Sequence, residues 1–477
     1  MIASASRLLT AVCALAGSAA ALTALEVKGK DFVNSKTGDR FQIIGVDYQP
    51  GGEAAYTGKK DPLSQPDACL RDAALMQRLG VNTIRVYNLA PNLNHDECVS
   101  IFNAAGIYMI LDVNSPFSTG SLNRAEPWTS YDAEYYGQVF GVIEAFKNFD
   151  NVLGFFAGNE VINQDAAYSA PAYVRAVIRD MKDYIAKNSK RAIPVGYSAA
   201  DVRDILMDTE RYFECQLSNS TTSRADFFGL NSYSWCGDAT YTSSGYNVLT
   251  EDFSNATIPV FFSEYGCNNV KPRTFTEVQA LYGEDMTQAF SGGLVYEWTE
   301  EDNQYGLIKV NSDGSVTLRT DYDNLKTQFS KIDMSRIESS NTSQSSIKAE
   351  TCSPSLITES TFYNAWDLPK APSKVSDYIS SGLPSASTGA LTSVTATSFT
   401  QSVTDANGSK VTGVTLKIMS GDESNSPSSS SSNSTSSSSS ASGSAASVTH
   451  SGAASFNVPS LAAGGISGLF MLLASLL

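Results

Sequence analysis

Histidine is almost absent from this sequence, which contains two among its 477 residues. His450 lies in a serine-rich stretch, so His95 is the one histidine within the part of the chain that has the composition of a folded domain. A zinc site with several histidine ligands is therefore excluded, and a Ser-His-Asp triad would have to be built on His95. We expect the chemistry to rest on carboxylates and tyrosines, with no metal and no cofactor.

Basic residues are also in deficit, with 33 Lys and Arg against 49 Asp and Glu and a formal net charge of -16. Proteins that bind nucleic acid need a basic face, so this charge balance argues against a nucleic-acid partner. An acidic surface is compatible with a secreted protein that acts on a neutral polymer.

Neither end of the chain has an apolar run with both the length and the basic flanks of a transmembrane helix. Residues 8–20 follow Arg7 and end at an A-x-A cleavage pattern, which predicts a signal peptide over residues 1–21. Residues 461–477 form an uncharged apolar tail after small residues and a short spacer. This order is typical of a GPI-attachment signal, with a transmembrane helix as the alternative.

Composition divides the rest of the chain into further segments. We expect a catalytic domain over residues 22–335, an extension over 336–420 that is partly ordered near Cys352, a stalk over 421–452, and a GPI propeptide over 453–477. The stalk is serine-rich and has almost no apolar bulk, which predicts a disordered, O-glycosylated segment or a plain flexible linker. Together these segments predict a secreted protein held at the cell surface, by a GPI anchor in the plasma membrane or in the cell wall.

The folded region alternates apolar, strand-like runs with helical patterns. The expected strands are 41–46, 83–87, 107–113, 152–157, 193–197, 227–233, 260–264 and 293–297. The expected helices are 67–79, 96–105, 133–148, 170–187, 201–207 and 277–290. Eight such units over about 300 residues predict an α/β fold, a (β/α)8 TIM barrel, followed by a disulfide-tied extension and the disordered Ser-rich tail. A doubly wound open sheet is the alternative.

Strands four and seven of this series each deliver one glutamate. The run 152–157 leads to Asn159 and Glu160, and the run 260–263 leads to Glu264. A glycosidase needs at least two carboxyl groups that flank the glycosidic bond. One acts as proton donor and the other as nucleophile. The alternative is that both are ordinary loop acids, but their joint position at the ends of strands four and seven favours catalysis.

Other side chains at strand ends suit a sugar substrate. Asn159 can bond the sugar 2-OH. Arg85 and Tyr233 can hold Glu264 ionised, and tyrosine rings offer flat apolar faces with a hydroxyl at the edge. The candidate ring-binding residues are Tyr87, Tyr233 and Tyr296. The competing acids, for which we favour hydrogen-bonding roles, are Asp47, Asp112, Glu297 and Asp302.

Six cysteines remain once Cys13 leaves with the signal peptide, and six allow fifteen pairings. The barrel brings neighbouring loops together, which favours Cys69–Cys98 and Cys236–Cys267 and leaves Cys215–Cys352. The last bond would tie the post-barrel segment to the barrel. The N-glycosylation sequons begin at Asn219, Asn255, Asn341, Asn407 and Asn433.

Six stretches carry a resemblance to a known family. They read GVDYQPGG (45–52), NTIRVY (82–87), FFAGNEV (155–161), NSYSWCG (231–237), FFSEYGCN (261–268) and GGLVYEW (292–298). The region 25–352 thereby resembles glycoside hydrolase family 72, the fungal GPI-anchored β-1,3-glucanosyltransferases of the Gas/Gel/Phr type. Some members carry a cysteine-rich glucan-binding module after the barrel, and we expect this chain to be without it, because only Cys352 follows Cys267 in the sequence.

The resemblance implies a role for each matching residue. Glu160 would be the acid/base and Glu264 the nucleophile, with Tyr233 as its partner. Tyr87, Asn159 and Tyr296 match donor-site residues. Asp201 and Arg203 match the acceptor-side loop.

The expected activity is therefore a retaining transfer between β-1,3-glucan chains. It would cleave an internal linkage, join the new reducing end to the non-reducing end of another chain, and so elongate cell-wall glucan. The alternatives are an endo-β-1,3-glucanase that uses the same carboxylates and a non-catalytic glucan-binding wall protein.

Overall fold

The computed structural model describes residues 21–164, 169–339, 348–360, 362 and 365–427. Eight parallel strands close into a barrel with the order β10-β11-β4-β5-β6-β7-β8-β9. Their bounds are β4 Ile43–Tyr48, β5 Thr83–Val86, β6 Tyr108–Asp112, β7 Val152–Asn159, β8 Val195–Ala200, β9 Phe228–Asn231, β10 Val260–Tyr265 and β11 Gly292–Val295. The TIM barrel is confirmed, and the open sheet is wrong because β11 pairs with β4 and closes the ring.

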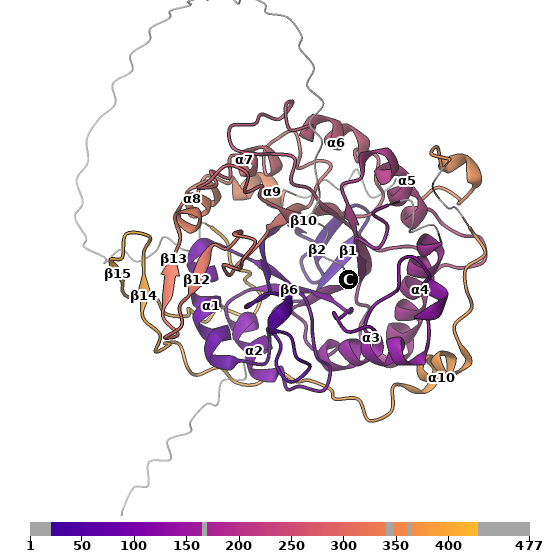
Figure 1. Cartoon of the computed structure of the whole chain (residues 1–477), viewed down its shortest axis with the longest axis horizontal. Coiled ribbons are helices and arrows are strands. Elements are labelled where there is room, and N and C mark those ends of the chain that lie inside the picture. The colour runs from indigo at the N-terminus through magenta and orange to yellow at the C-terminus, as the bar shows by residue number, and fades with distance from the viewer. Residues whose placement is uncertain (1–20, 165–168, 340–347, 361, 363–364, 428–477) are drawn as a thin grey trace, which may run out of the picture. The chain divides into compact units, whose positions relative to one another are not determined.

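Helices α1 to α8 surround these strands (Figure 1). Their bounds are α1 Pro66–Leu79, α2 Asp96–Ala104, α3 Ala133–Phe146, α4 Ala170–Asn188, α5 Arg203–Glu214, α6 Tyr246–Asp252, α7 Glu277–Leu281 and α8 Thr320–Phe329. The helix expected over 277–290 is wrong beyond Leu281, because Gly283 follows two residues later and glycine costs about 1 kcal/mol in a helix. Helix α5 extends well past the expected 201–207.

Aromatic side chains fill the barrel interior near the N-terminal ends of the strands. The rings of Phe156 and Phe227 lie 5.3 Å apart between centroids. Phe32, from a small antiparallel sheet, lies 5.9 Å from both Phe227 and Phe261. That sheet consists of β1 Leu25–Lys28, β2 Asp31–Asn34 and β3 Arg40–Phe41. It closes the N-terminal end of the barrel with apolar side chains, so the polar groups of the interior lie toward the other end.

The three disulfides are those expected from the barrel. Cys69–Cys98 links α1 to α2, and Cys236–Cys267 links the loops after β9 and β10. Cys215–Cys352 joins the end of α5 to the chain that follows the barrel. Their Cα–Cα distances are 5.4, 5.1 and 5.0 Å in that order, within the ordinary range for disulfides.

The chain after the barrel continues along its outside (Figure 1). Its elements are α9 Met334–Glu338, η5 Pro354–Leu356, α10 Ser373–Ser381, β14 Val403–Thr404 and β15 Lys410–Val411. Helix α10 packs against α4 and α3. Strands β14 and β15 extend a sheet begun by β12 Ile308–Val310 and β13 Val316–Leu318. These residues therefore pack on the barrel well beyond Cys352.

The last described residues return to the N-terminal end of the barrel. The Thr23 hydroxyl donates to Asp422 at 2.6 Å, and the side-chain amide of Asn425 donates to the Val81 carbonyl at 2.8 Å. The Asn425 backbone N–H donates to the Gly106 carbonyl at 2.8 Å. Gly80 and Gly106 both have positive φ and lie so close to this segment that a Cβ at either would clash with it.

Candidate active site

Both candidate glutamates lie where a barrel strand loses its regular register. The pairing of β7 with β8 shifts between Phe156 and Asn159, and Glu160 follows with a φ of 47°. The pairing of β10 with β9 shifts between Phe262 and Glu264. Such irregularities re-aim the side chains beside them, and a left-handed non-glycine residue persists only where its surroundings hold it. The local backbone thus brings both carboxyls to the C-terminal end of the barrel.

Three donors converge on the carboxylate of Glu264, which is 8% exposed. The Tyr87 hydroxyl donates to Oε1 at 2.9 Å, and the Arg85 guanidinium reaches the same oxygen at 3.2 Å. The Tyr233 hydroxyl donates to Oε2 at 2.7 Å. Both oxygens are therefore oriented, and the charged form of Glu264 is the form that these donors stabilise.

Arg85 is itself held rigidly in the barrel interior and is fully buried. Its Nε and one terminal nitrogen bind the two oxygens of Asp112 at 2.9 and 3.2 Å. Its guanidinium lies 4.3 Å from the ring centroid of Tyr87 and 4.6 Å from that of Phe156. The bidentate pairing leaves its remaining donors aimed at the Glu264 side of the barrel.

Glu160 has a different environment. Its Oε1 accepts a 2.8 Å hydrogen bond from the side-chain amide of Asn231, and Asn231 also donates to the amide oxygen of Asn159 at 3.0 Å. The Glu160 backbone N–H donates a hydrogen bond to the Ser198 carbonyl at 2.8 Å. Sequence reasoning placed Asn231 in a motif without giving it a role, although it ends β9 only two residues before Tyr233.

The two carboxyls differ in the groups that surround them. The pKa of Glu264 is raised to about 7, because burial, the largest effect, and the charge of Glu160 raise it more than Arg85, Tyr233 and Tyr87 lower it. A guanidinium and two phenols donate to Glu264, whereas Glu160 accepts from one neutral amide. The two carboxyls therefore lie in different hydrogen-bonding environments.

Aromatic rings line the approach to Glu264. The ring centroids of Tyr233 and Tyr296 lie 6.3 Å apart, and Tyr305 lies 5.6 Å from the first and 5.3 Å from the second. Tyr305 was not among the sequence-based candidates, because it comes from an irregular loop after β11 where no periodicity marks it. The three half-buried rings offer the flat apolar surface that sugar rings favour.

Asp201 and Arg203 lie at the end of β8 and the start of α5. They form an ion pair with each other, and the Ser232 hydroxyl donates to Asp201 at 2.8 Å. Neither residue contacts Glu160 or Glu264 directly. The structure therefore brings this pair to the same end of the barrel as the glutamates but not into their immediate network.

The competing acids occupy supporting positions. Asp112 holds Arg85. Asp47 is fully buried, and burial raises its pKa well above the usual range. Glu297 accepts a 2.7 Å bond from Asn303, and burial raises its pKa to about 7. Asp302 is exposed. Asp112 binds Arg85, which in turn binds Glu264, as expected for a hydrogen-bonding role.

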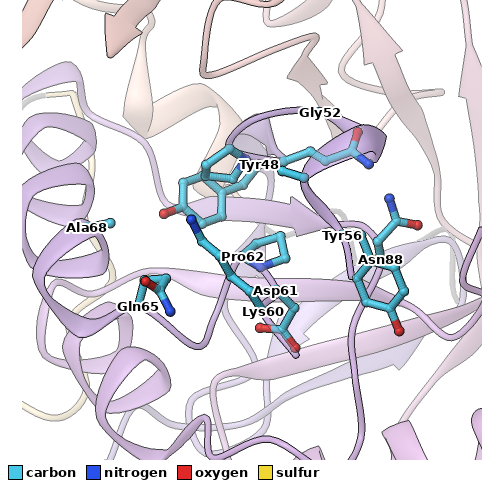
Figure 2. Close-up of a pocket in the computed structure, with 12 residues that line it drawn as sticks. Tyr48, Gly52, Tyr56, Lys60, Asp61, Pro62, Gln65, Ala68 and Asn88 are labelled. Atoms are coloured by element: carbon cyan, nitrogen blue, oxygen red, sulfur yellow. The ribbon is translucent and has the colours of Figure 1, made fainter. Parts of the chain in front are cut away.

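His95 lies apart from this site. It is buried, and its ring Nε2 bonds to Asp61 at 2.7 Å rather than to a serine hydroxyl. Asp61 also lines a cavity of about 60 Å³ beside Tyr48 and Tyr56, which contains neither glutamate (Figure 2). This arrangement gives no support to a Ser-His-Asp triad built on His95.

Three comparisons place the chain among known proteins. The family model for glucanosyltransferases, glycoside hydrolase family 72, matches residues 14–333. The 1,3-beta-glucanosyltransferase gel2 of Aspergillus fumigatus is 66% identical over 423 residues, or 89% of each chain. The 1,3-beta-glucanosyltransferase GAS4 of Saccharomyces cerevisiae is 49% identical over 66% of this chain and 67% of its own.

A solved structure agrees with these relatives. Saccharomyces cerevisiae Gas2p in complex with laminaritriose and laminaritetraose superposes with a TM-score of 0.66 at 40% identity, over 73% of this chain and 77% of that chain. The barrel, the paired glutamates and these matches lead to one conclusion. The chain belongs to the glucanosyltransferase family, glycoside hydrolase family 72.

Proposed function

We propose that this chain is a retaining β-1,3-glucan transglycosylase in which Glu264 is the nucleophile and Glu160 is the acid/base. The observation that carries the proposal is the convergence of Arg85, Tyr87 and Tyr233 on Glu264, since it prepares one carboxylate of the pair as an anion. The glucanosyltransferase activity for which the relatives are named and the laminari-oligosaccharides in the Gas2p complex support the substrate class.

In the first step, Glu264 attacks the anomeric carbon of an internal β-1,3 linkage. Glu160 gives its proton to the leaving oxygen, which keeps the electron pair of the broken bond. A glycosyl-enzyme forms on Glu264, and the leaving chain departs with a new non-reducing end. Tyr87, Asn159 and Tyr296 bind the donor chain, with Asn159 on the 2-OH of the sugar that reacts.

In the second step, Glu160 acts as a base. It takes the proton of the 3-OH at the non-reducing end of another glucan chain, and that oxygen displaces Glu264. The product is a longer chain with the same linkage, and no metal is needed to balance the reaction. The Asp201–Arg203 pair is our candidate for the acceptor side.

Product analysis tests this proposal. Incubation with reduced laminari-oligosaccharides should yield both longer and shorter products, which mass spectrometry separates. Shorter products alone would identify an endo-β-1,3-glucanase, and unchanged substrate with retained binding would identify a non-catalytic wall protein.

We expect Tyr233→Phe to move the acidic limb of the kcat/KM profile for transfer to higher pH. The Tyr233 hydroxyl lowers the pKa of Glu264, and the nucleophile must be ionised to attack. A hydrogen bond to a charged group contributes about 1.5–3 kcal/mol, which corresponds to about one to two pH units. Tyr305→Phe is the matched control, since it removes a hydroxyl from the same ring cluster but no bond to Glu264. An unmoved limb in Tyr233→Phe would contradict the role.

The segments at the two ends are also proposals. Residues 1–20 and 428–477 lie outside the described residues, and so do Asn341 and Asn433. In the described part of the chain, no helix is long and apolar enough to cross a bilayer. We propose secretion and a GPI anchor, with glycans on the exposed Asn219, Asn255 and Asn407.

Release of the protein from cells tests the anchor. We expect phosphatidylinositol-specific phospholipase to free it from membranes, or glucanase to free it from walls. Detection of residues 461–477 in the mature protein by peptide mapping would contradict a cleaved GPI signal.

A further inference from the structure

Asn231 connects the two candidate catalytic carboxyls. It ends strand β9, is 3% exposed, and bonds in two directions. Its oxygen accepts from the hydroxyls of Ser198 at 3.1 Å and Ser263 at 2.8 Å, and lies 3.5 Å from a terminal nitrogen of Arg85. Its nitrogen donates to Asn159 and Glu160. The side chain is therefore fully bonded, and each end faces a different part of the site.

The orientation of the Asn231 amide is determined by its neighbours. Serine hydroxyls can donate or accept, so they do not distinguish the amide oxygen from the nitrogen. Arginine can only donate, so the end of the amide that faces Arg85 must be the oxygen. Because Asp112 fixes Arg85, the amide nitrogen of Asn231 has to face Glu160 and Asn159.

This orientation has a consequence for Glu160. The carbonyl oxygen of a protonated carboxyl accepts a hydrogen bond better than its hydroxyl oxygen does. The N–H from Asn231 at 2.8 Å on Oε1 therefore favours the form in which Oε1 is the carbonyl oxygen and Oε2 carries the proton. The second N–H occupies the oxygen of Asn159, which leaves the Asn159 amide nitrogen to face substrate.

We propose that Asn231 is a positioning residue that places the catalytic proton on Oε2 of Glu160 and orients the amide of Asn159. The inference rests on the proposed function. In glycosylation the proton moves from Oε2 to the leaving oxygen, the bond between that oxygen and the anomeric carbon breaks, and Glu264 bonds to the carbon. In transfer the acceptor 3-OH returns a proton to Oε2. Asn231 itself exchanges no proton.

Asn231→Asp tests the role, because it keeps an acceptor toward Arg85 and the two serines and removes both N–H donors. We expect cleavage of laminari-oligosaccharides to fall about a hundredfold, within the range that general acid catalysis contributes. Fluoride release from a β-laminaribiosyl fluoride in the first turnover should fall less than about fivefold, since fluoride leaves without a proton. An equal loss on both donors, or no loss on either, would overturn the proposal.

Ser198→Ala is the matched control. It removes one hydroxyl from the acceptor side of Asn231 and leaves both amide hydrogens in place. We expect a small loss, about fivefold or less, of equal size on the two donors. If Ser198→Ala lost much more activity on laminari-oligosaccharides than on the fluoride, as expected for Asn231→Asp, that difference could not be attributed to the N–H donors of Asn231.

Neutron diffraction on the deuterated wild-type protein provides a measurement that does not depend on the folding of a variant. A deuteron on Oε2 of Glu160 is expected, and a deuteron on Oε1 would overturn the proposal. If wild-type protein forms no products from laminari-oligosaccharides, the proposed function itself fails. If it turns over but the two donors respond equally to Asn231→Asp, only the positioning role fails.

Discussion

Glu264→Gln should abolish turnover on laminari-oligosaccharides and leave glucan binding intact. The amide cannot form the glycosyl-enzyme, and loss of a catalytic nucleophile costs a factor on the order of 10⁴ to 10⁶ in kcat. The substitution keeps the shape and an oxygen that can accept from Tyr87, Arg85 or Tyr233. Rates from chromatography of the products and affinities from calorimetry with laminari-oligosaccharides measure the two effects separately.

Glu301→Gln is a suitable control for that experiment. Glu301 is a half-buried acid that bonds the Gly51 backbone N–H and the Thr299 hydroxyl, outside the contacts of either candidate glutamate. It should retain most of the activity. Substantial turnover by Glu264→Gln, above the level that contamination by wild-type protein explains, would assign the nucleophile elsewhere.

Glu160→Ala should lose activity on natural glucan but keep activity on an activated donor. Removal of a general acid costs about 10²–10⁴-fold on a poor leaving group. A β-laminaribiosyl fluoride needs no proton, so it should still glycosylate Glu264 and then stall, because no base activates the acceptor. Intact-protein mass spectrometry should detect the trapped glycosyl-enzyme.

Azide distinguishes the two-step mechanism from a single displacement. The space that Glu160→Ala creates lies on the side from which the acceptor attacks, so azide should give a β-azide. An α-azide would show that the assignment is wrong.

The distance between the two carboxyl groups also distinguishes the mechanisms. Retaining enzymes hold their carboxyls about 5–5.5 Å apart and inverting enzymes about 6.5–9.5 Å apart. We expect the shorter separation between Glu160 and Glu264 in a crystal structure.

The barrel could be predicted because its parallel strands are buried on both faces. Such strands appear as short apolar runs, as Val152 to Phe156 does, and helices between them have a regular apolar period. Glu160 and Glu264 were conspicuous because an acid directly after such a run is costly to place there without a function.

Other features depend on contacts that periodicity does not encode. The register shift before Glu264 and the left-handed backbone of Glu160 arise from local packing. Asn231 bonds to side chains from four other strands, so no single window of sequence contains its network. The course of the chain after Cys352 could not be predicted either, since short strands such as β14 are stabilised by a partner far away in sequence.

The contact between Thr23 and Asp422 means that the first and last described parts of the chain are neighbours in space. A gene could therefore be rearranged so that a short linker joins these two points and new termini open in an exposed loop elsewhere. Such a circular permutant would keep the barrel strands in their order around the ring. The same neighbourhood makes the region before residue 22 a poor place for a bulky fusion tag, because a tag there would compete with the returning chain for one end of the barrel.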